Sequence, residues 1–92
     1  MTLKTALDDI LGRAANAGTV PGVSAVVTNR DGNLYEGAFG SRTLGTDAAM
    51  TVDTVGWIAS CTKAITGAAC MQLVERGKVE LDGPASKYVP KL

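Results

Sequence analysis

A serine and a lysine that stand three residues apart are the side chains of this sequence best suited to do chemistry. They are Ser60 and Lys63, the two ends of the run Ser60-Cys61-Thr62-Lys63. Residues three apart lie on the same face of a helix, so the hydroxyl and the amine would be neighbours. Burial disfavours a charged ammonium, and a neutral amine can take the serine proton. The pair therefore predicts a serine nucleophile with a lysine as its base, as in acyl transfer.

The start of a helix would add to this chemistry, and the sequence places Ser60 at such a start. A helix N-terminus carries a positive field and free backbone N–H groups, which favour negative charge on a carbonyl oxygen. The backbone N–H of Ser60 is then expected to form half of an oxyanion hole. A plainer interpretation of the same four residues is a serine that caps the helix, followed by a solvated lysine.

The sequence after Lys63 favours the catalytic interpretation. Between Ala64 and Met71 the only polar side chain is Thr66, and Gly77 is a typical stop for the helix. A helix that is apolar nearly all round is typical of burial on several sides. A solvated lysine does not belong at the start of such a helix, because an unpaired buried charge is costly.

The elements before this helix are short and few. Spacing and turn signals predict a helix over Thr2–Ala17 ended by Gly18, strands over Val23–Thr28 and Leu34–Phe39 with Asp31-Gly32 in the turn between them, and a loop over Ser41–Met50. Two strands and two helices cannot cover a helix that is apolar on all sides, and a lone hairpin leaves open sheet edges. We therefore expect the helix that begins at Ser60 to pack against elements outside these residues.

Composition and charge exclude several classes of partner. The chain has 92 residues, of which 46% are hydrophobic and 20% charged, as in a globular protein. Nine basic and nine acidic residues cancel, so neither nucleic acid nor an anionic membrane is an expected partner. Two acids, Asp8 and Asp9, stand where a secretory signal would carry apolar residues, and no stretch reaches membrane-spanning length. The expected location is cytoplasmic, unless a signal was trimmed away.

The two cysteines are expected to be small buried hydrophobes. Cys61 and Cys70 are nine residues apart in the predicted helix, which puts them on opposite faces and roughly 13 Å apart along its axis. They cannot form a disulfide with each other. The sequence contains no histidine to activate Cys61. Without histidine, and with separated cysteines, no metal site or cofactor is expected.

Other residues are given structural interpretations. Asp8 and Asp9 are adjacent on a solvated helix face and do not form a paired acid/base site. The run Gly37-Ala38-Phe39-Gly40 lacks the lysine and the strand-to-helix setting of a phosphate loop. Tyr35 and Tyr88 are interpreted as packing residues, and Trp57 as a core residue, with pocket lining as its alternative.

Two segments together resemble a known family. Trp57–Lys63, followed by Leu73–Asp82, resembles the nucleophile region of family VIII carboxylesterases and class C β-lactamases. Further likeness to that family's opening strands and later segments lies in Pro21–Val27, Phe39-Gly40, Asp53-Thr54 and Tyr88–Pro90. The resemblance covers nearly all of the chain after Val20. It implies a mixed α+β fold of the β-lactamase/transpeptidase type, with an antiparallel sheet flanked by helices, a mostly helical second domain, and the active site between them.

The chain also departs from that family. The family completes its site with a tyrosine from a Tyr-x-Asn motif and with a strand motif of Lys-Thr-Gly or His/Trp-x-Gly type, and neither occurs here. Tyr88 is followed by Val89 and Pro90, so it does not match. We therefore expect residues 1–92 to be the N-terminal segment of a longer serine hydrolase, inactive alone. Its expected partner is the rest of the enzyme, in the same chain or in a separate one.

The resemblance implies a two-step reaction on an ester or amide carbonyl. Ser60 attacks, Lys63 helps to remove its proton, the family's tyrosine acts as co-base, and water releases the acyl group. A carboxylesterase is the expected activity. The alternatives are a β-lactamase, a D-amino peptidase or an amide hydrolase of the same superfamily, or a non-catalytic fragment that packs against a separate chain.

Overall fold

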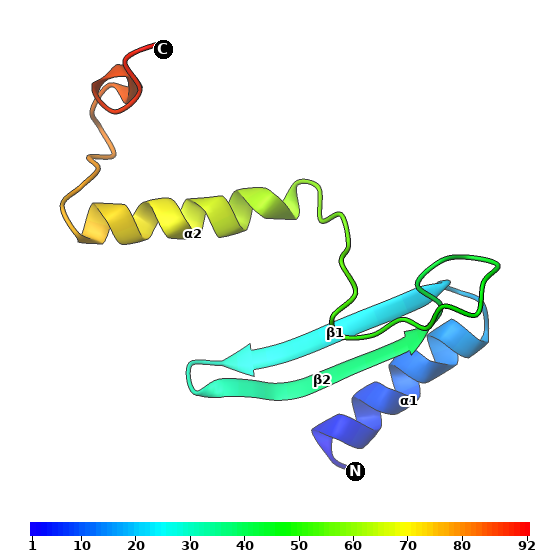
Figure 1. Ribbon diagram of the computed structural model, residues 1–92. Helices are drawn as coiled ribbons and strands as arrows, with labels where there is room; N and C mark the ends of the chain where they lie inside the picture. The colour runs from blue at the N-terminus through cyan, green and yellow to red at the C-terminus, as the bar shows by residue number, and fades with distance from the viewer. The chain divides into compact units, whose positions relative to one another are not determined.

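The computed structural model describes all 92 residues, which form two compact units, Met1–Val55 and Gly56–Leu92. Its elements, labelled in Figure 1 except for the last, are helix α1 (Leu3–Asn16), strands β1 (Gly22–Asn29) and β2 (Gly32–Gly40), helix α2 (Cys61–Glu75) and the short 3₁₀ helix η1 (Ala85–Lys87). Two helices and a two-stranded antiparallel sheet confirm the expected α+β class. Each unit is described separately below.

Helix α1 begins and ends close to its predicted bounds because its end signals are local. The side chain of Thr2 accepts a hydrogen bond from the backbone N–H of Thr5, and the Thr5 side chain accepts one from the Thr2 N–H. This reciprocal capping satisfies two of the N–H groups that lack a helical partner. At the other end, Gly18 takes a left-handed conformation with φ 71°, which ends the helix.

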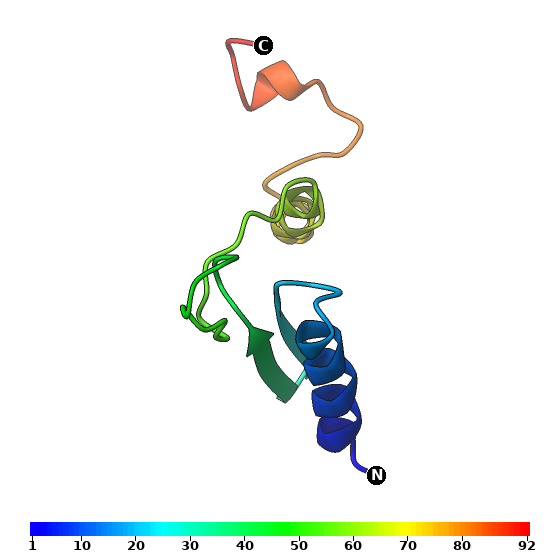
Figure 2. The same ribbon diagram turned by 90° about the vertical axis from the view of Figure 1, so that its right-hand side faces the viewer.

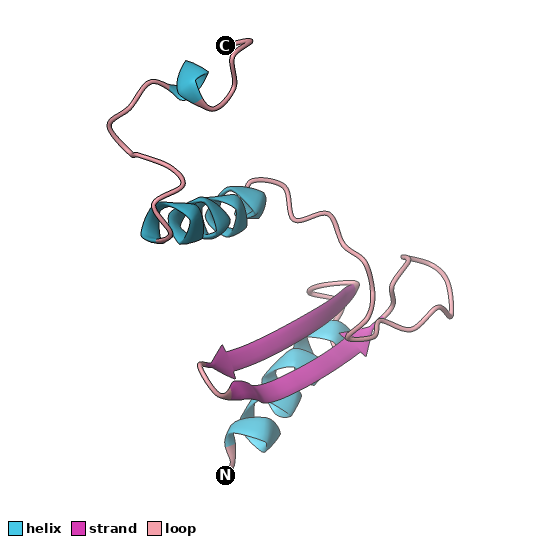
Figure 3. Ribbon diagram, turned by 60° about the vertical axis from the view of Figure 1, so that its left-hand side comes forward, coloured by secondary structure: helices cyan, strands magenta, loops and turns pink.

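Strands β1 and β2 form a hairpin with a two-residue turn (Figure 3). The turn is Arg30-Asp31, and the side chain of Asn29 accepts hydrogen bonds from the N–H groups of Asp31 at 2.8 Å and Gly32 at 3.1 Å. A bulge between Val27 and Thr28 shifts the register, so that Val27 faces Tyr35 and Thr28 faces Asn33. The predicted strands and their antiparallel pairing are confirmed.

Helix α1 lies along one face of the hairpin (Figure 2). The centre of this contact is Tyr35, the one buried side chain of the molecule, which is 4% exposed. Two residues further along β2, Gly37 lies beneath the ring, where a Cβ atom would overlap the Tyr35 hydroxyl. Phe39 approaches Gly12 of α1, whose added Cβ would lie 3.5 Å from the ring. Tyr35 is therefore a packing residue, as predicted.

The structure corrects the prediction for Asp8. Instead of lying on a solvated face, its side chain is only 32% exposed, and it accepts a hydrogen bond from the Tyr35 hydroxyl at 2.8 Å. The pKa of Asp8 is lowered mainly by the hydrogen bond from the Lys4 ammonium and secondly by the hydrogen bond from Tyr35. The pKa of Tyr35 is raised mainly by desolvation and secondly by its hydrogen bond to the Asp8 carboxylate. Asp9 pairs with Arg13 at 2.8 Å on the exposed face, as expected of a solvated acid.

The ends of the two strands meet at a pair of glycines. A Cβ atom at Gly22 would overlap the carbonyl oxygen of Ser41, and one at Gly40 would overlap that of Pro21. The N–H of Ser41 donates to the Pro21 carbonyl at 2.8 Å, which closes this end of the hairpin. Residues 41–50 then form the predicted loop, apart from one bridge between Ser41 and Ala49.

The second unit consists of helix α2 and the segment after it. Gly77, with φ 67°, follows the C-cap of α2, and the Lys78 N–H donates to the Leu73 carbonyl at 2.8 Å, as in a helix-ending turn. Within the segment after α2, the Tyr88 hydroxyl accepts a hydrogen bond from the backbone N–H of Glu80 at 2.8 Å. No helix combines the length and the apolar character needed to cross a membrane.

Helix α2 has no buried residue. The predicted burial of Cys61 and Cys70 is therefore wrong within these 92 residues, where both are exposed and free. The apolar composition of α2 favours burial of its side chains, but none of them is buried within its own unit. That α2 packs against elements outside these residues stays a prediction.

Candidate active site

The backbone of Ser60 places its hydroxyl where it can react. Ser60 precedes the first residue of α2, but its φ of −67° and ψ of −11° are already helical, and its side chain makes no capping hydrogen bond. A capping serine has extended backbone angles and accepts from an N–H of the first turn. Ser60 therefore occupies the N-cap position, and Lys63 is exposed, as in the plainer interpretation. The expected side-chain cap is absent, so the Ser60 hydroxyl is left for another partner.

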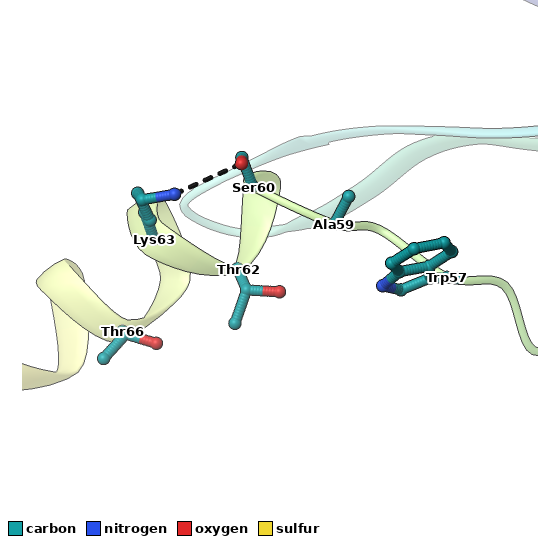
Figure 4. Close-up of a pocket in the computed structure, with 6 residues that line it drawn as sticks. All are labelled: Trp57, Ala59, Ser60, Thr62, Lys63 and Thr66. Carbon is teal, nitrogen blue, oxygen red and sulfur yellow. Dashed lines mark hydrogen bonds between the residues drawn. The ribbon is translucent and has the colours of Figure 1, made fainter.

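That partner is Lys63. Its Nζ lies 3.2 Å from Ser60 Oγ, and Figure 4 shows the two side chains pointing toward each other across the first turn. The spacing of three residues in a helix produces this contact, as the sequence predicted. The structure thus brings together the two side chains singled out from the sequence, within hydrogen-bonding reach.

The backbone around Ser60 is a tight turn. The N–H groups of Cys61, Thr62 and Lys63 donate to the carbonyls three residues earlier, at 3.0, 3.1 and 3.0 Å. The N–H of Ser60 itself makes no hydrogen bond with any other residue of the chain. It is a free donor at the positive end of a helix, beside the serine oxygen.

Ala59 has a backbone conformation that the sequence did not indicate. Its φ of 46° makes it the one residue other than glycine with a positive φ. The left-handed region costs an L-residue roughly 1–2 kcal/mol. Such strain is typical of functional sites, where surrounding structure maintains it. No sequence signal marks it, because glycine or asparagine would be the residues that suggest a left-handed turn.

An open, solvent-facing cavity of about 570 Å³ lies beside the pair. Its lining residues are Trp57, Ala59, Ser60, Thr62, Lys63 and Thr66 (Figure 4). Trp57 is 95% exposed, so its prediction as a core residue is wrong within these 92 residues. Its indole lies at the edge of the open cavity, which agrees with the alternative of pocket lining.

The lining contributes one ionisable side chain, Lys63. Thr62 and Thr66 add hydroxyl groups that the sequence-based prediction of the site missed. Thr66 carried a signal, as the only polar residue between Ala64 and Met71 and as the residue three positions after Lys63. Cys61 does not line the cavity. No cluster of histidine, cysteine, aspartate or glutamate side chains could hold a metal ion.

The Beta-lactamase family matches the chain over residues 7–92, which include Ser60 and Lys63. The chain belongs to the Beta-lactamase family.

Relatives in this family include esterases and acyltransferases. The lovastatin esterase of Penicillium rubens is 36% identical over 89 residues, which cover 94% of this chain and 22% of that protein. Esterase EstB of Burkholderia gladioli is 31% identical over 90 residues, which cover 98% and 23%. Acyltransferase mokF of Monascus pilosus is 36% identical over 85 residues, which cover 86% and 21%. The chain thus spans about a fifth of the length of these relatives. No solved structure gives a significant match.

Proposed function

We propose that this Beta-lactamase-family chain carries the nucleophile of a carboxylesterase that works through an acyl-enzyme intermediate. Ser60 is the nucleophile and Lys63 its base. The observation that carries the proposal is the 3.2 Å contact between Lys63 Nζ and a Ser60 Oγ that does not cap its helix. An uncapped serine hydroxyl against an amine is the arrangement that nucleophilic catalysis requires.

The reaction has two steps. A neutral Lys63 amine takes the Ser60 proton as Oγ attacks the ester carbonyl carbon, and the carbonyl oxygen becomes an oxyanion. The backbone N–H of Ser60, which has no acceptor within the chain, would donate one hydrogen bond to that oxyanion. The carbon–oxygen bond to the alcohol then breaks, and the leaving oxygen takes a proton from the Lys63 ammonium. Water attacks the acyl-serine in the same manner and releases the acid.

Two parts of this site have to come from outside these 92 residues. An oxyanion hole needs a second donor, and resemblance to family VIII carboxylesterases implies a tyrosine that shares the work of the base. The exposed apolar surface of α2 supports a covering layer that would bring both. We propose that this layer is the rest of the same enzyme, and that the 92 residues without it do not turn over substrate.

Esters are the substrate class that the relatives favour. The lovastatin esterase and EstB are both named as esterases. The open cavity beside Ser60 is lined mainly by short side chains and one indole, which supports a substrate without charged groups. We propose a small ester substrate. A β-lactam or an amide remains the alternative within the same chemistry.

A second candidate is acyl transfer to an alcohol, which the 36% identity to acyltransferase mokF favours. The same acyl-serine would form, and an alcohol would replace water in the second step. Product analysis of the complete enzyme with an ester, in the presence and absence of an added acceptor alcohol, separates the two. Free acid in both reactions supports the esterase, and a new ester as the main product supports the transferase.

The proposal is tested by replacing Ser60 with alanine in the complete enzyme. Turnover of a p-nitrophenyl ester should fall on the order of a thousandfold or more, because the nucleophile is lost. A serine-directed phosphonate should label Ser60 in the unaltered protein. Ser41→Ala and Ser86→Ala are the matched controls and should both be labelled normally. Labelling at Ser24, Ser41 or Ser86 in place of Ser60 would refute the assignment.

A further inference from the structure

The open cavity beside the nucleophile is lined by one basic side chain and by no acidic one. Of its lining residues only Lys63 is ionisable, and its Nζ lies 3.2 Å from Ser60 Oγ. We infer that Lys63 binds carboxylates, above all the acid that the reaction releases, and that the bound acid inhibits the enzyme by holding the base in its charged form. This inference rests on the proposed function, because it concerns the product of that reaction.

Lys63 has no carboxylate partner in the chain. Four of the nine cations form ion pairs, and among the other five Lys63 is the one that lines this cavity. Within its unit no other element contacts α2. The other titratable side chains of the helix, Cys61, Cys70 and Glu75, do not line the cavity. An ammonium without a partner is a favourable site for a carboxylate, which accepts short, strong hydrogen bonds from it.

The last step of the proposed reaction forms a carboxylic acid beside this lysine. The water oxygen bonds to the carbonyl carbon of the acyl-serine, and the bond from that carbon to Ser60 Oγ breaks. One proton of the water passes to Oγ, and the other stays on the acid. With a pKa of about 4, the acid then gives this proton to the neutral Lys63 amine. Each turnover thus ends with a carboxylate beside an ammonium.

A carboxylate held there would prevent the next turnover for two reasons. It occupies the place of the ester carbonyl next to Ser60, and its negative charge favours the ammonium over the neutral amine that acts as base. Ion pairs between exposed groups contribute little to binding. The covering layer proposed above would exclude water from this pair, and the carboxylate would then be held more strongly.

Activity and inhibition should therefore depend on pH in opposite directions. Ester hydrolysis needs the neutral amine of Lys63, whereas carboxylate binding needs the ammonium. The value of kcat/KM should rise with pH as the lysine of the free enzyme loses its proton, and the affinity for a carboxylate should fall over the same range. Because one proton on one group governs both quantities, the two pH profiles should share a midpoint.

The test uses the complete enzyme with p-nitrophenyl butanoate as substrate and with butanoate and butanamide as inhibitors. The two inhibitors have nearly the same shape and differ in charge. We expect butanoate to compete with the ester, with an inhibition constant on the order of tenfold below that of butanamide at the acidic end of the profile. This difference should disappear as kcat/KM rises. Equal inhibition constants at every pH would overturn the inference while leaving Ser60 as the nucleophile.

Calorimetric titration with the same two compounds extends the test to variants that turn over no ester. Lys63→Arg keeps its charge at every working pH, so it should bind butanoate without the pH dependence. Lys63→Met should bind butanoate no better than butanamide. The control is Lys78→Met, which removes an unpaired cation outside the cavity and should leave both affinities unchanged.

Two outcomes separate this inference from the proposed function. A preference for butanoate that survived in Lys63→Met would overturn the inference, because another group would then hold the carboxylate. An unaltered protein that bound butanoate through Lys63, but neither turned over esters nor took the phosphonate at Ser60, would instead overturn the proposed function.

Discussion

At the scale of single residues, Lys63 is one of five cations of the chain that form no ion pair, with Arg42, Arg76, Lys78 and Lys91. Lys4, Arg13, Arg30 and Lys87 all form ion pairs with carboxylates. Lys63 forms none, and its Nζ faces the Ser60 hydroxyl. The side chain that contacts the Lys63 ammonium is thus a hydroxyl, which can give up a proton, and not a carboxylate.

The role of Lys63 is tested by replacing it with arginine and with methionine. Arginine keeps a positive charge but does not lose its proton at working pH, so Lys63→Arg should lose most of the acylation rate, on the order of a hundredfold or more. Lys63→Met should lose as much, while both variants stay folded. Single-turnover acylation of the complete enzyme is the measurement. If Lys63→Arg acylated at nearly the full rate, Lys63 would act as a fixed charge, and the base would have to be the tyrosine supplied from elsewhere.

At the scale of elements, the contact between α1 and β2 includes two glycines that lie against aromatic rings. Gly37 and Gly12 illustrate two opposite cases. Gly37 lies under Tyr35, whose ring is buried and hydrogen-bonded to Asp8. Gly12 lies in the middle of α1, at an ordinary contact distance from Phe39. The same substitution should therefore have opposite effects at the two sites.

Alanine at Gly37 should destabilise the protein by about 1–3 kcal/mol, because the Cβ displaces the Tyr35 ring and breaks its bond to Asp8. Alanine at Gly12 should stabilise it by about 0.5–1 kcal/mol, because a helix interior disfavours glycine and the added methyl group fits against Phe39. Urea unfolding of the complete protein measures both. Destabilisation of equal size at Gly12 would show that α1 approaches β2 more closely than described.

The elements were predictable where their signals are local. Thr2 and Gly18 mark the ends of α1, and Asp31-Gly32 marks the hairpin turn to within one residue of the observed Arg30-Asp31, so these bounds came from the sequence within a residue or two. The bond between Tyr35 and Asp8 joins residues 27 positions apart, and no periodic pattern predicts it. The Ser60–Lys63 pair was predictable because helical spacing alone creates it. The strain at Ala59 was not, because alanine carries no turn signal.

At the scale of the whole molecule, the apolar side chains of the second unit are the main unexplained surface. Trp57, Ile65 and Leu73 are all exposed, Ile65 at 64%. Apolar surface of this extent is typical of a protein that packs against something else. The incorrect predictions for Trp57 and the two cysteines share this cause, since composition indicates a preference for burial but not what provides it.

The 92-residue segment expressed alone should therefore associate with itself. Sedimentation velocity should show species larger than the monomer whose share grows with concentration, and coexpression with the rest of the protein should suppress them. Replacing Ile65 and Leu73 with glutamate in the segment should restore the monomer, whereas Leu34→Glu, in the hairpin, should have a smaller effect. A monomeric segment that unfolds cooperatively without a partner would contradict the expected covering of α2.

The shortness of the chain between Ser60 and Lys63 has a consequence for how chemical labelling is interpreted. Contacts between near neighbours in sequence require little loop-closure entropy and form early, whereas distant contacts form late. The serine–lysine pair therefore requires only that α2 has formed. The second oxyanion donor and the tyrosine of the proposed site come from outside these residues and would arrive later. A preparation can then contain the formed pair without a complete site, and only turnover would count the complete molecules.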